Sequence, residues 1–144
     1  MIYYFVSTNK RWLGEVRNMK GKILIADDEE SIRFTFADFL NGGGYQVETA
    51  DSLSSCIKKM QAEPFDLLFL DIGLGSDNGI EAIEGIKVLQ PDCSVVIITG
   101  GMSPETITKA RRYGAIDYLT KPIREASLLY VAQKVLAPKL AVNS

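Results

Sequence analysis

The sequence contains no histidine among its 144 residues. Catalytic triads with an imidazole base, HExxH metalloproteases and zinc sites that need imidazole are therefore excluded. Cysteine is scarce: Cys56 and Cys93 lie too far apart for a CxxC motif and are too few for a disulfide framework. Two unpaired thiols suit a reducing compartment. Any chemistry must depend on carboxylates, hydroxyls, lysine and a bound metal.

Long hydrophobic runs and an excess of one charge are also missing. No stretch reaches the 18 apolar residues of a membrane span. The apolar run Ile2–Val6 precedes Lys10 and Arg11, which is the reverse of the order in a secretory signal peptide. We therefore expect a cytoplasmic protein with no membrane contact. Sixteen basic and 18 acidic residues leave a net charge of −2, so we expect no direct binding to nucleic acid.

The sequence as a whole is 47% apolar and 24% charged, which is typical of one folded domain at this length. From residue 22 onward, short apolar runs alternate five times with stretches of helical period. Strands are expected near 23–26, 45–50, 67–70, 95–98 and 116–119, and helices near 32–40, 53–60, 80–89, 104–113 and 128–136. Gly42–Gly44 is expected to end the first helix, Asp51 or Ser52 to cap the second, and Pro138 to follow the last.

The alternation of strands and helices predicts an α/β fold, because right-handed crossovers place helices on both faces of a parallel sheet. The strands near 23–26, 67–70 and 95–98 are apolar throughout and should be central. The other two carry polar residues and should be edges. These features predict the flavodoxin-like doubly wound (βα)5 fold, with a five-stranded parallel sheet in the order 2-1-3-4-5.

Polar side chains follow the ends of four predicted strands. They are Asp27 and Asp28, Asp71, Thr99 and Lys121. Ligands bind at the carboxyl ends of the strands in such a sheet, so we expect these side chains to meet. Each pair of carboxylates at roughly 4 Å repels by about 4 kcal/mol at an effective dielectric constant of about 20. A divalent cation among the three acids would offset that repulsion, and Mg²⁺ suits oxygen ligands.

This set of side chains is able to take up a phosphoryl group. Asp71 would attack the phosphorus in line, while the metal and Lys121 neutralise charge on the transferred oxygens and Thr99 donates a hydrogen bond. The product would be an aspartyl phosphate, which hydrolyses readily and suits a signal.

Between about Lys22 and Ala137 the sequence resembles the receiver domain of two-component response regulators. The segments that carry the resemblance are KILIADDEES, FDLLFLDIGLGSDNG with Gly79 eight residues after Asp71, VVIITG, and GAIDYLTKP. The resemblance implies that Asp71 is the phosphoacceptor. It also implies a Mg²⁺ site formed by Asp27, Asp28, Asp71 and the backbone carbonyl of Gly73.

The resemblance further implies a switch and its partners. Thr99 would turn toward the phosphoryl group and Tyr118 would follow inward, remodelling the face of the fourth helix, fifth strand and fifth helix. Taken alone, a tyrosine at position 118 is more often an edge-strand packing residue than a switch. The phosphodonor would be a histidine kinase or a phosphotransfer protein, and the remodelled face could form a homodimer. Such a protein is no conventional enzyme, because it catalyses only its own phosphorylation and dephosphorylation.

Two loops depart from the common family pattern. Gly73-Leu74-Gly75 stands where many members carry Met-Pro, and Gly100-Gly101 stands where many carry alanine and a larger residue. We hypothesise an unusually open phosphorylation pocket with an altered phosphate lifetime.

Two other functions compete with a phosphorylated switch. One is a receiver-like module that binds a protein partner without phosphate. The other is a haloacid-dehalogenase-like phosphatase, which needs a DxD motif, whereas the second acidic position here is Gly73. The predicted organisation is an N-terminal extension over 1–20, a receiver domain over 21–137 and a tail over 138–144. We expect Ile2–Val6 to pack on a sheet edge or a neighbouring chain.

Overall fold

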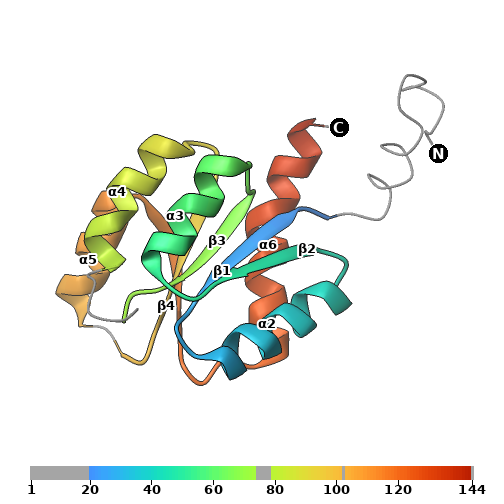
Figure 1. The fold of residues 1–144 in the computed structure, drawn as a ribbon, viewed down its shortest axis with the longest axis horizontal. Helices are drawn as coiled ribbons and strands as arrows, with labels where there is room; N and C mark the ends of the chain where they lie inside the picture. The colour runs from blue at the N-terminus through green and yellow to red at the C-terminus, as the bar shows by residue number, and fades with distance from the viewer. Residues whose placement is uncertain (1–19, 74–78, 102, 144) are drawn as a thin grey trace.

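A computed structural model of the chain describes residues 20–73, 79–101 and 103–143. Within these residues five strands alternate with five helices (Figure 1). In chain order the elements are β1 (Lys22–Ala26), α2 (Glu30–Gly42), β2 (Gln46–Ala50), α3 (Leu53–Ala62), β3 (Leu67–Asp71), α4 (Gly79–Leu89), β4 (Ser94–Thr99), α5 (Pro104–Tyr113), β5 (Ala115–Thr120) and α6 (Glu125–Asn143). Every predicted strand and helix is present, with ends shifted by a few residues at most sites.

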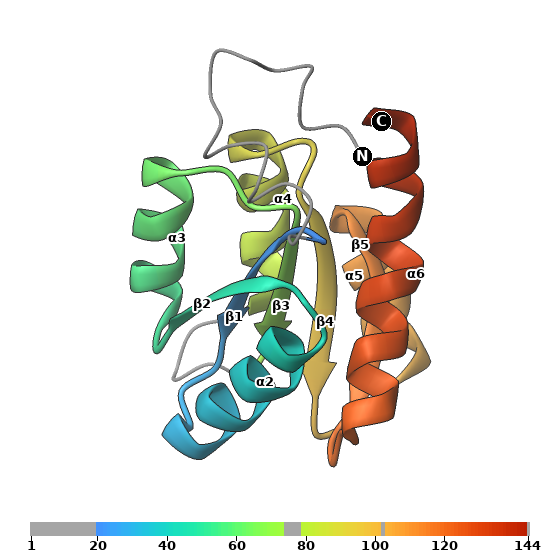
Figure 2. The same cartoon turned by 90° about the vertical axis from the view of Figure 1, so that its right-hand side faces the viewer.

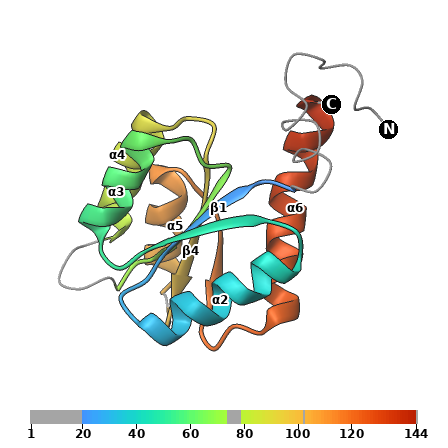
Figure 3. The same ribbon diagram turned by 45° about the vertical axis from the view of Figure 1, so that its right-hand side comes forward.

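The five strands form one parallel sheet in the order β2-β1-β3-β4-β5. Helices α3, α4 and α5 cover one face, and α2 and α6 cover the other (Figures 2 and 3). The predicted flavodoxin-like order is therefore confirmed. The central strands β1, β3 and β4 are buried apart from Lys22, while β2 and β5 are partly exposed edges.

Alternate side chains of each central strand enter different cores, because successive residues point to opposite faces. In β3, Leu68 and Leu70 pack with α3 and α4, whereas Leu67 and Phe69 pack with α2 and α6. All four are fully buried. Burial of a side chain of this size stabilises the fold by about 1.5–3 kcal/mol. The continuous apolar run is thus explained by a strand covered on both faces.

Local signals end the helices largely where they were expected. Ser52, rather than Asp51, caps α3, because its side chain accepts a hydrogen bond from the Ser55 amide at 3.1 Å. Helix α2 ends at Gly42, and Gly44 adopts a φ of 97°, which favours glycine. The prediction that the last helix ends before Pro138 is wrong, since α6 continues to Asn143. A proline removes one backbone hydrogen bond, and the rest of the helix persists around it.

The topology places the ends of β1, β3, β4 and β5 at one edge of the sheet (Figure 1). Strand register pairs Ala26 with Leu70, Asp71 with Ile98, and Thr99 with Thr120. The residues that follow these strands are therefore neighbours. The peptide bond between Lys121 and Pro122 is cis. Within the described ranges, no helix has the length and hydropathy needed to cross a membrane. The prediction for Ile2–Val6 lies outside the described residues.

Candidate functional site

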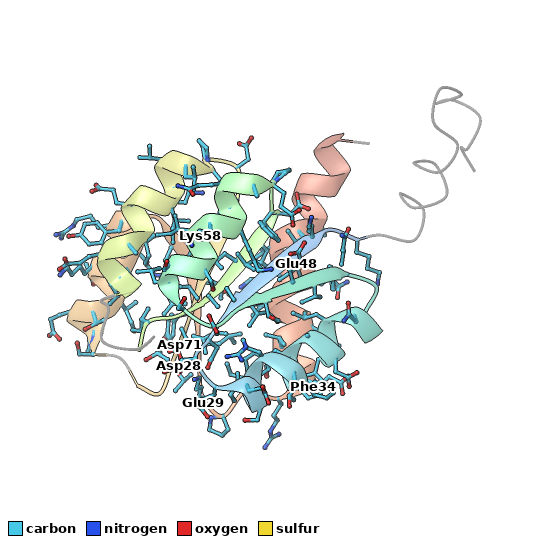
Figure 4. The ribbon with its side chains drawn as sticks, viewed as in Figure 1. Asp28, Glu29, Phe34, Glu48, Lys58 and Asp71 are labelled. Carbon is cyan, nitrogen blue, oxygen red and sulfur yellow. The ribbon has the colours of Figure 1, made fainter. Side chains whose placement is uncertain are left out.

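Three carboxylates meet at the carboxyl edge of the sheet, as predicted. Asp27 and Asp28 follow β1, and Asp71 ends β3. One oxygen from each lies within 4.8 Å of the others. Figure 4 shows Asp28 and Asp71 close together, with Glu29 beside them at the start of α2. Asp27 is fully buried, Asp71 is 6% exposed and Asp28 faces solvent.

Asp27 is held on several sides. Its amide donates to the Ala50 carbonyl at 3.1 Å, and its Oδ1 accepts from the Glu29 amide at 2.9 Å. Its Oδ2 lies 3.0 Å from Lys121 Nζ. Burial raises the pKa of Asp27 above its ordinary value and the charge of Asp71 adds to this, while the Glu29 amide and Lys121 oppose it.

Lys121 lies within the acidic cluster and bridges two of its members. Its Nζ is 3.0 Å from Asp27 Oδ2 and 3.3 Å from Asp71 Oδ2. The Lys121 amide donates to the Thr99 carbonyl at 2.7 Å, which ties the end of β5 to β4. Burial alone would lower the pKa of Lys121, but the attraction of Asp27 and Asp71 outweighs it and the pKa is raised. Lys121 therefore stays charged.

Asp71 has one oxygen toward Lys121 and the other toward the following turn. Its Oδ1 accepts from the Gly73 amide at 2.9 Å. The same turn explains why residue 79 is a glycine. A Cβ at this position would lie 2.8 Å from the backbone Cα of Ile72, which is too close for any side chain. Leu74 and Gly75, the other residues of the predicted glycine-rich loop, lie outside the described residues.

Thr99 ends β4 beside β3 and is nearly buried. Its hydroxyl donates to the Gly101 carbonyl oxygen and accepts from the Gly101 amide, both at 3.1 Å. The side chain is thus engaged within its own loop. Tyr118 lies in β5 opposite Ile97 and is 37% exposed. The structure places Thr99 at the carboxyl end of β4, next to the strand that carries Asp71, and leaves Tyr118 on the surface.

The donor set of the pocket fits a small divalent cation. The three acids offer hard oxygen ligands, which Mg²⁺ and Ca²⁺ prefer. The buried Oδ2 of Asp27 accepts no aligned hydrogen bond from the described residues, although Lys121 lies nearby as an ion pair. A buried carboxylate oxygen in that state has capacity for a cation. A divalent ion would also relieve the repulsion that helps to raise the pKa of Asp27.

Sequence reasoning missed two contributors to this site. Glu29 was not named as a site residue, yet its backbone amide holds the Asp27 carboxylate. Arg33 was not singled out, yet its Nη1 donates to the Asp27 carbonyl oxygen at 2.8 Å. The only signal for Arg33 in the sequence is its position one helical turn after Glu29.

Comparisons with known proteins agree with this geometry. Residues 23–133 match the model of the response regulator receiver domain. The alginate biosynthesis transcriptional regulatory protein AlgB of Pseudomonas aeruginosa is 40% identical over 117 residues. That match covers 81% of this chain and 26% of AlgB. The chain thus spans about a quarter of the length of this curated relative.

Two solved structures are similar over most of the chain. A CheY-like receiver domain from Methanospirillum hungatei has a TM-score of 0.79 at 30% identity, covering 83% of this chain and 96% of that one. A response regulator from Burkholderia pseudomallei has a TM-score of 0.70 at 33% identity, covering 85% and 75%. The latter contains a phosphorylated aspartic acid, a calcium ion and citrate. With the acidic pocket of Asp27, Asp28, Asp71 and Lys121, these findings show that the chain belongs to the response regulator receiver domain family.

Proposed function

We propose that this receiver domain accepts a phosphoryl group on Asp71 from a histidine kinase or a phosphotransfer protein, with Mg²⁺ as the metal, in the cytoplasm. The observation that carries the proposal is the placement of the Asp71 carboxylate. It shares a pocket with Asp27 and Asp28 and lies 3.3 Å from the Lys121 ammonium. The phosphorylated aspartic acid and calcium ion of the Burkholderia structure support it.

In the transfer step an Asp71 carboxylate oxygen forms a bond to phosphorus while the bond from phosphorus to the donor nitrogen breaks. The electron pair of the broken bond leaves with that nitrogen. Lys121, already paired with Asp71, is placed to neutralise charge on the transferred oxygens. Asp27, Asp28, Asp71 and the Gly73 carbonyl would hold Mg²⁺, which supplies further neutralisation of the phosphoryl oxygens.

The same proposal assigns Thr99 and Tyr118 to the switch. The Thr99 hydroxyl would leave Gly101 and donate to the phosphoryl group, and Tyr118 would pack inward. The affected surface carries three exposed apolar side chains, Ile116, Tyr118 and Tyr130, which lie on β5 and α6. The Asp117–Lys134 ion pair at 3.0 Å joins these two elements. We propose the surface of α5, β5 and α6 as a phosphorylation-dependent partner or homodimer face.

The proposed receiver domain covers residues 21–137, with residues 1–20 as an added N-terminal element. The match to the family model over 23–133 supports this division. Residues 138–143 continue α6 rather than forming a separate tail.

Incubation with acetyl phosphate and Mg²⁺ tests the function. Intact-mass measurement should show the addition of one phosphoryl group, abolished in Asp71→Asn and by EDTA. Asp66→Asn is a suitable acidic control, since Asp66 lies at the other end of β3. Wild-type protein that gains no mass under these conditions would favour the phosphate-independent binding module instead.

A further inference from the structure

Arg33 links helix α2 to the acidic loop by both its backbone and its side chain. Its amide donates to the Glu29 carbonyl at 3.1 Å within the first helical turn. Its Nη1 reaches back along the chain and donates to the Asp27 carbonyl oxygen at 2.8 Å. The side chain is half-buried. Arg33 therefore clamps residues 27–29 between the end of β1 and the start of α2.

The Asp27 peptide needs such a donor because it lies at a buried strand end. The Asp27 amide is paired with Ala50 of β2, and its side chain is paired with the Glu29 amide and Lys121. A buried carbonyl without a partner destabilises the fold, because it loses its hydrogen bonds to water and gains none in return. A charged guanidinium is a stronger hydrogen-bond donor than a neutral group. The contact thus fixes the orientation of the peptide that joins Asp27 to Asp28.

That orientation determines where the exposed acid of the cluster lies. Asp28 faces solvent, so the path of the loop backbone sets its position relative to Asp27 and Asp71. One oxygen of each acid lies within 4.8 Å of the others, which allows the three to converge on one ion. We propose that Arg33 is a positioning residue for the divalent-cation site and acts through the Asp27 carbonyl. This inference rests on the metal-dependent function proposed above.

A positioning role and a simple charge effect predict opposite changes in Mg²⁺ affinity when Arg33 is replaced. A positive charge near a cation site weakens cation binding, so its removal should tighten binding if charge dominates. Loss of a group that orients metal ligands weakens binding, commonly by 10- to 100-fold. The sign of the change in Mg²⁺ affinity therefore separates the two mechanisms, and a purely structural role would lower the melting temperature alone.

The test is calorimetric titration of Mg²⁺ into the whole chain without a phosphodonor. Arg33→Met keeps the apolar stem but removes the donor and the charge, and we expect it to weaken Mg²⁺ binding about tenfold. Arg33→Lys keeps a single charged donor and should restore most of the affinity. Arg111→Met is the matched control, because Arg111 Nη1 makes a comparable contact with the Ile116 carbonyl at 3.3 Å. The control should leave the affinity unchanged.

Unchanged or tighter binding in Arg33→Met, with wild-type binding intact, would overturn the inference and leave the proposed function standing. Wild-type protein that binds no Mg²⁺ would overturn both. Should Arg33→Met fail to fold, Arg33→Gln serves as the neutral variant, and tighter binding there would contradict the positioning role.

Discussion

Thr99 and Gly101 hold each other through two hydrogen bonds, one in each direction and both 3.1 Å long. The Thr99 hydroxyl must give up the bond that it donates to the Gly101 carbonyl oxygen before it can donate to a phosphoryl group on Asp71. Neither Gly100 nor Gly101 has a positive φ, and a Cβ at either would meet nothing within 4 Å. This conformation therefore does not require glycine at either position. The two glycines lower the cost of rearranging the loop, since they permit backbone angles that other residues avoid.

Replacement of Thr99 by valine should separate phosphorylation from switching. The valine keeps the shape of the side chain but has no hydroxyl, so Asp71 should still be phosphorylated while Tyr118 stays exposed. NMR chemical shifts of Tyr118 with and without acetyl phosphate measure this. Thr108→Val is the control, because the Thr108 hydroxyl donates to the Pro104 carbonyl oxygen within its own helix, α5. A full Tyr118 response in Thr99→Val would argue against the proposed switch.

The open space at Gly101 should shorten the life of the aspartyl phosphate. An apolar side chain in Gly101→Leu would restrict the approach of water to Asp71, so we expect slower loss of phosphate. The rate is followed by intact mass after the phosphodonor is removed. Gly85→Leu adds the same side chain at an equally open position on α4 and should change nothing. Equal rates in Gly101→Leu and wild type would remove the open-pocket hypothesis.

Lys121 should compete with the metal for the acids. Lys121→Met leaves buried Asp27 without its cation, so the metal-free protein should lose about 3 kcal/mol of unfolding free energy. The same change should tighten Mg²⁺ binding, because two carboxylates become free of an ammonium. Urea denaturation and calorimetry measure the two effects. Lys134→Met is the control, because it removes an ion pair with Asp117 on the surface. It should change neither the unfolding free energy nor the Mg²⁺ affinity.

The raised pKa of Asp27 predicts a pH dependence of stability in metal-free protein. The folded state binds the Asp27 proton more tightly than the unfolded chain does. In the unfolded chain the pKa of this carboxyl is near 3.8. The Asp27 contribution to stability therefore increases as pH falls through the raised pKa, and the gain is complete below 3.8. Urea denaturation across this window should show the gain as a difference between wild type and Asp27→Asn. Saturating Mg²⁺ should shrink that difference, and a difference independent of pH would contradict the prediction.

Cys56 should be unreactive in the folded protein. Burial raises the pKa of this thiol to about 12, so almost no thiolate is present at pH 8. Iodoacetamide should label Cys56 only after urea unfolding, as peptide mass mapping would show. Rapid labelling of the native protein would indicate that the core between α3 and the sheet opens readily.

Local patterns were sufficient for most of the fold. The runs Leu67–Leu70 and Val95–Ile98 are short, rich in β-branched or bulky residues and apolar at every position, as expected of strands covered on both faces. The end of α6 could not be predicted in the same way. Pro138 suggested a stop, but a helix end depends on the balance of a whole turn of hydrogen bonds, and one missing bond did not decide it.

The sequence by itself determined the order of the strands and the edge of the sheet where Asp27, Asp71 and Lys121 meet. Apolar periodicity and the handedness of crossovers act through local chemistry, so they can be followed along the chain. Only the tertiary structure decided that Lys121 bridges two acids, that Gly101 engages Thr99, and that Arg33 holds the Asp27 carbonyl. Those contacts depend on distances of a few ångströms between side chains and loops, which residue spacing does not specify.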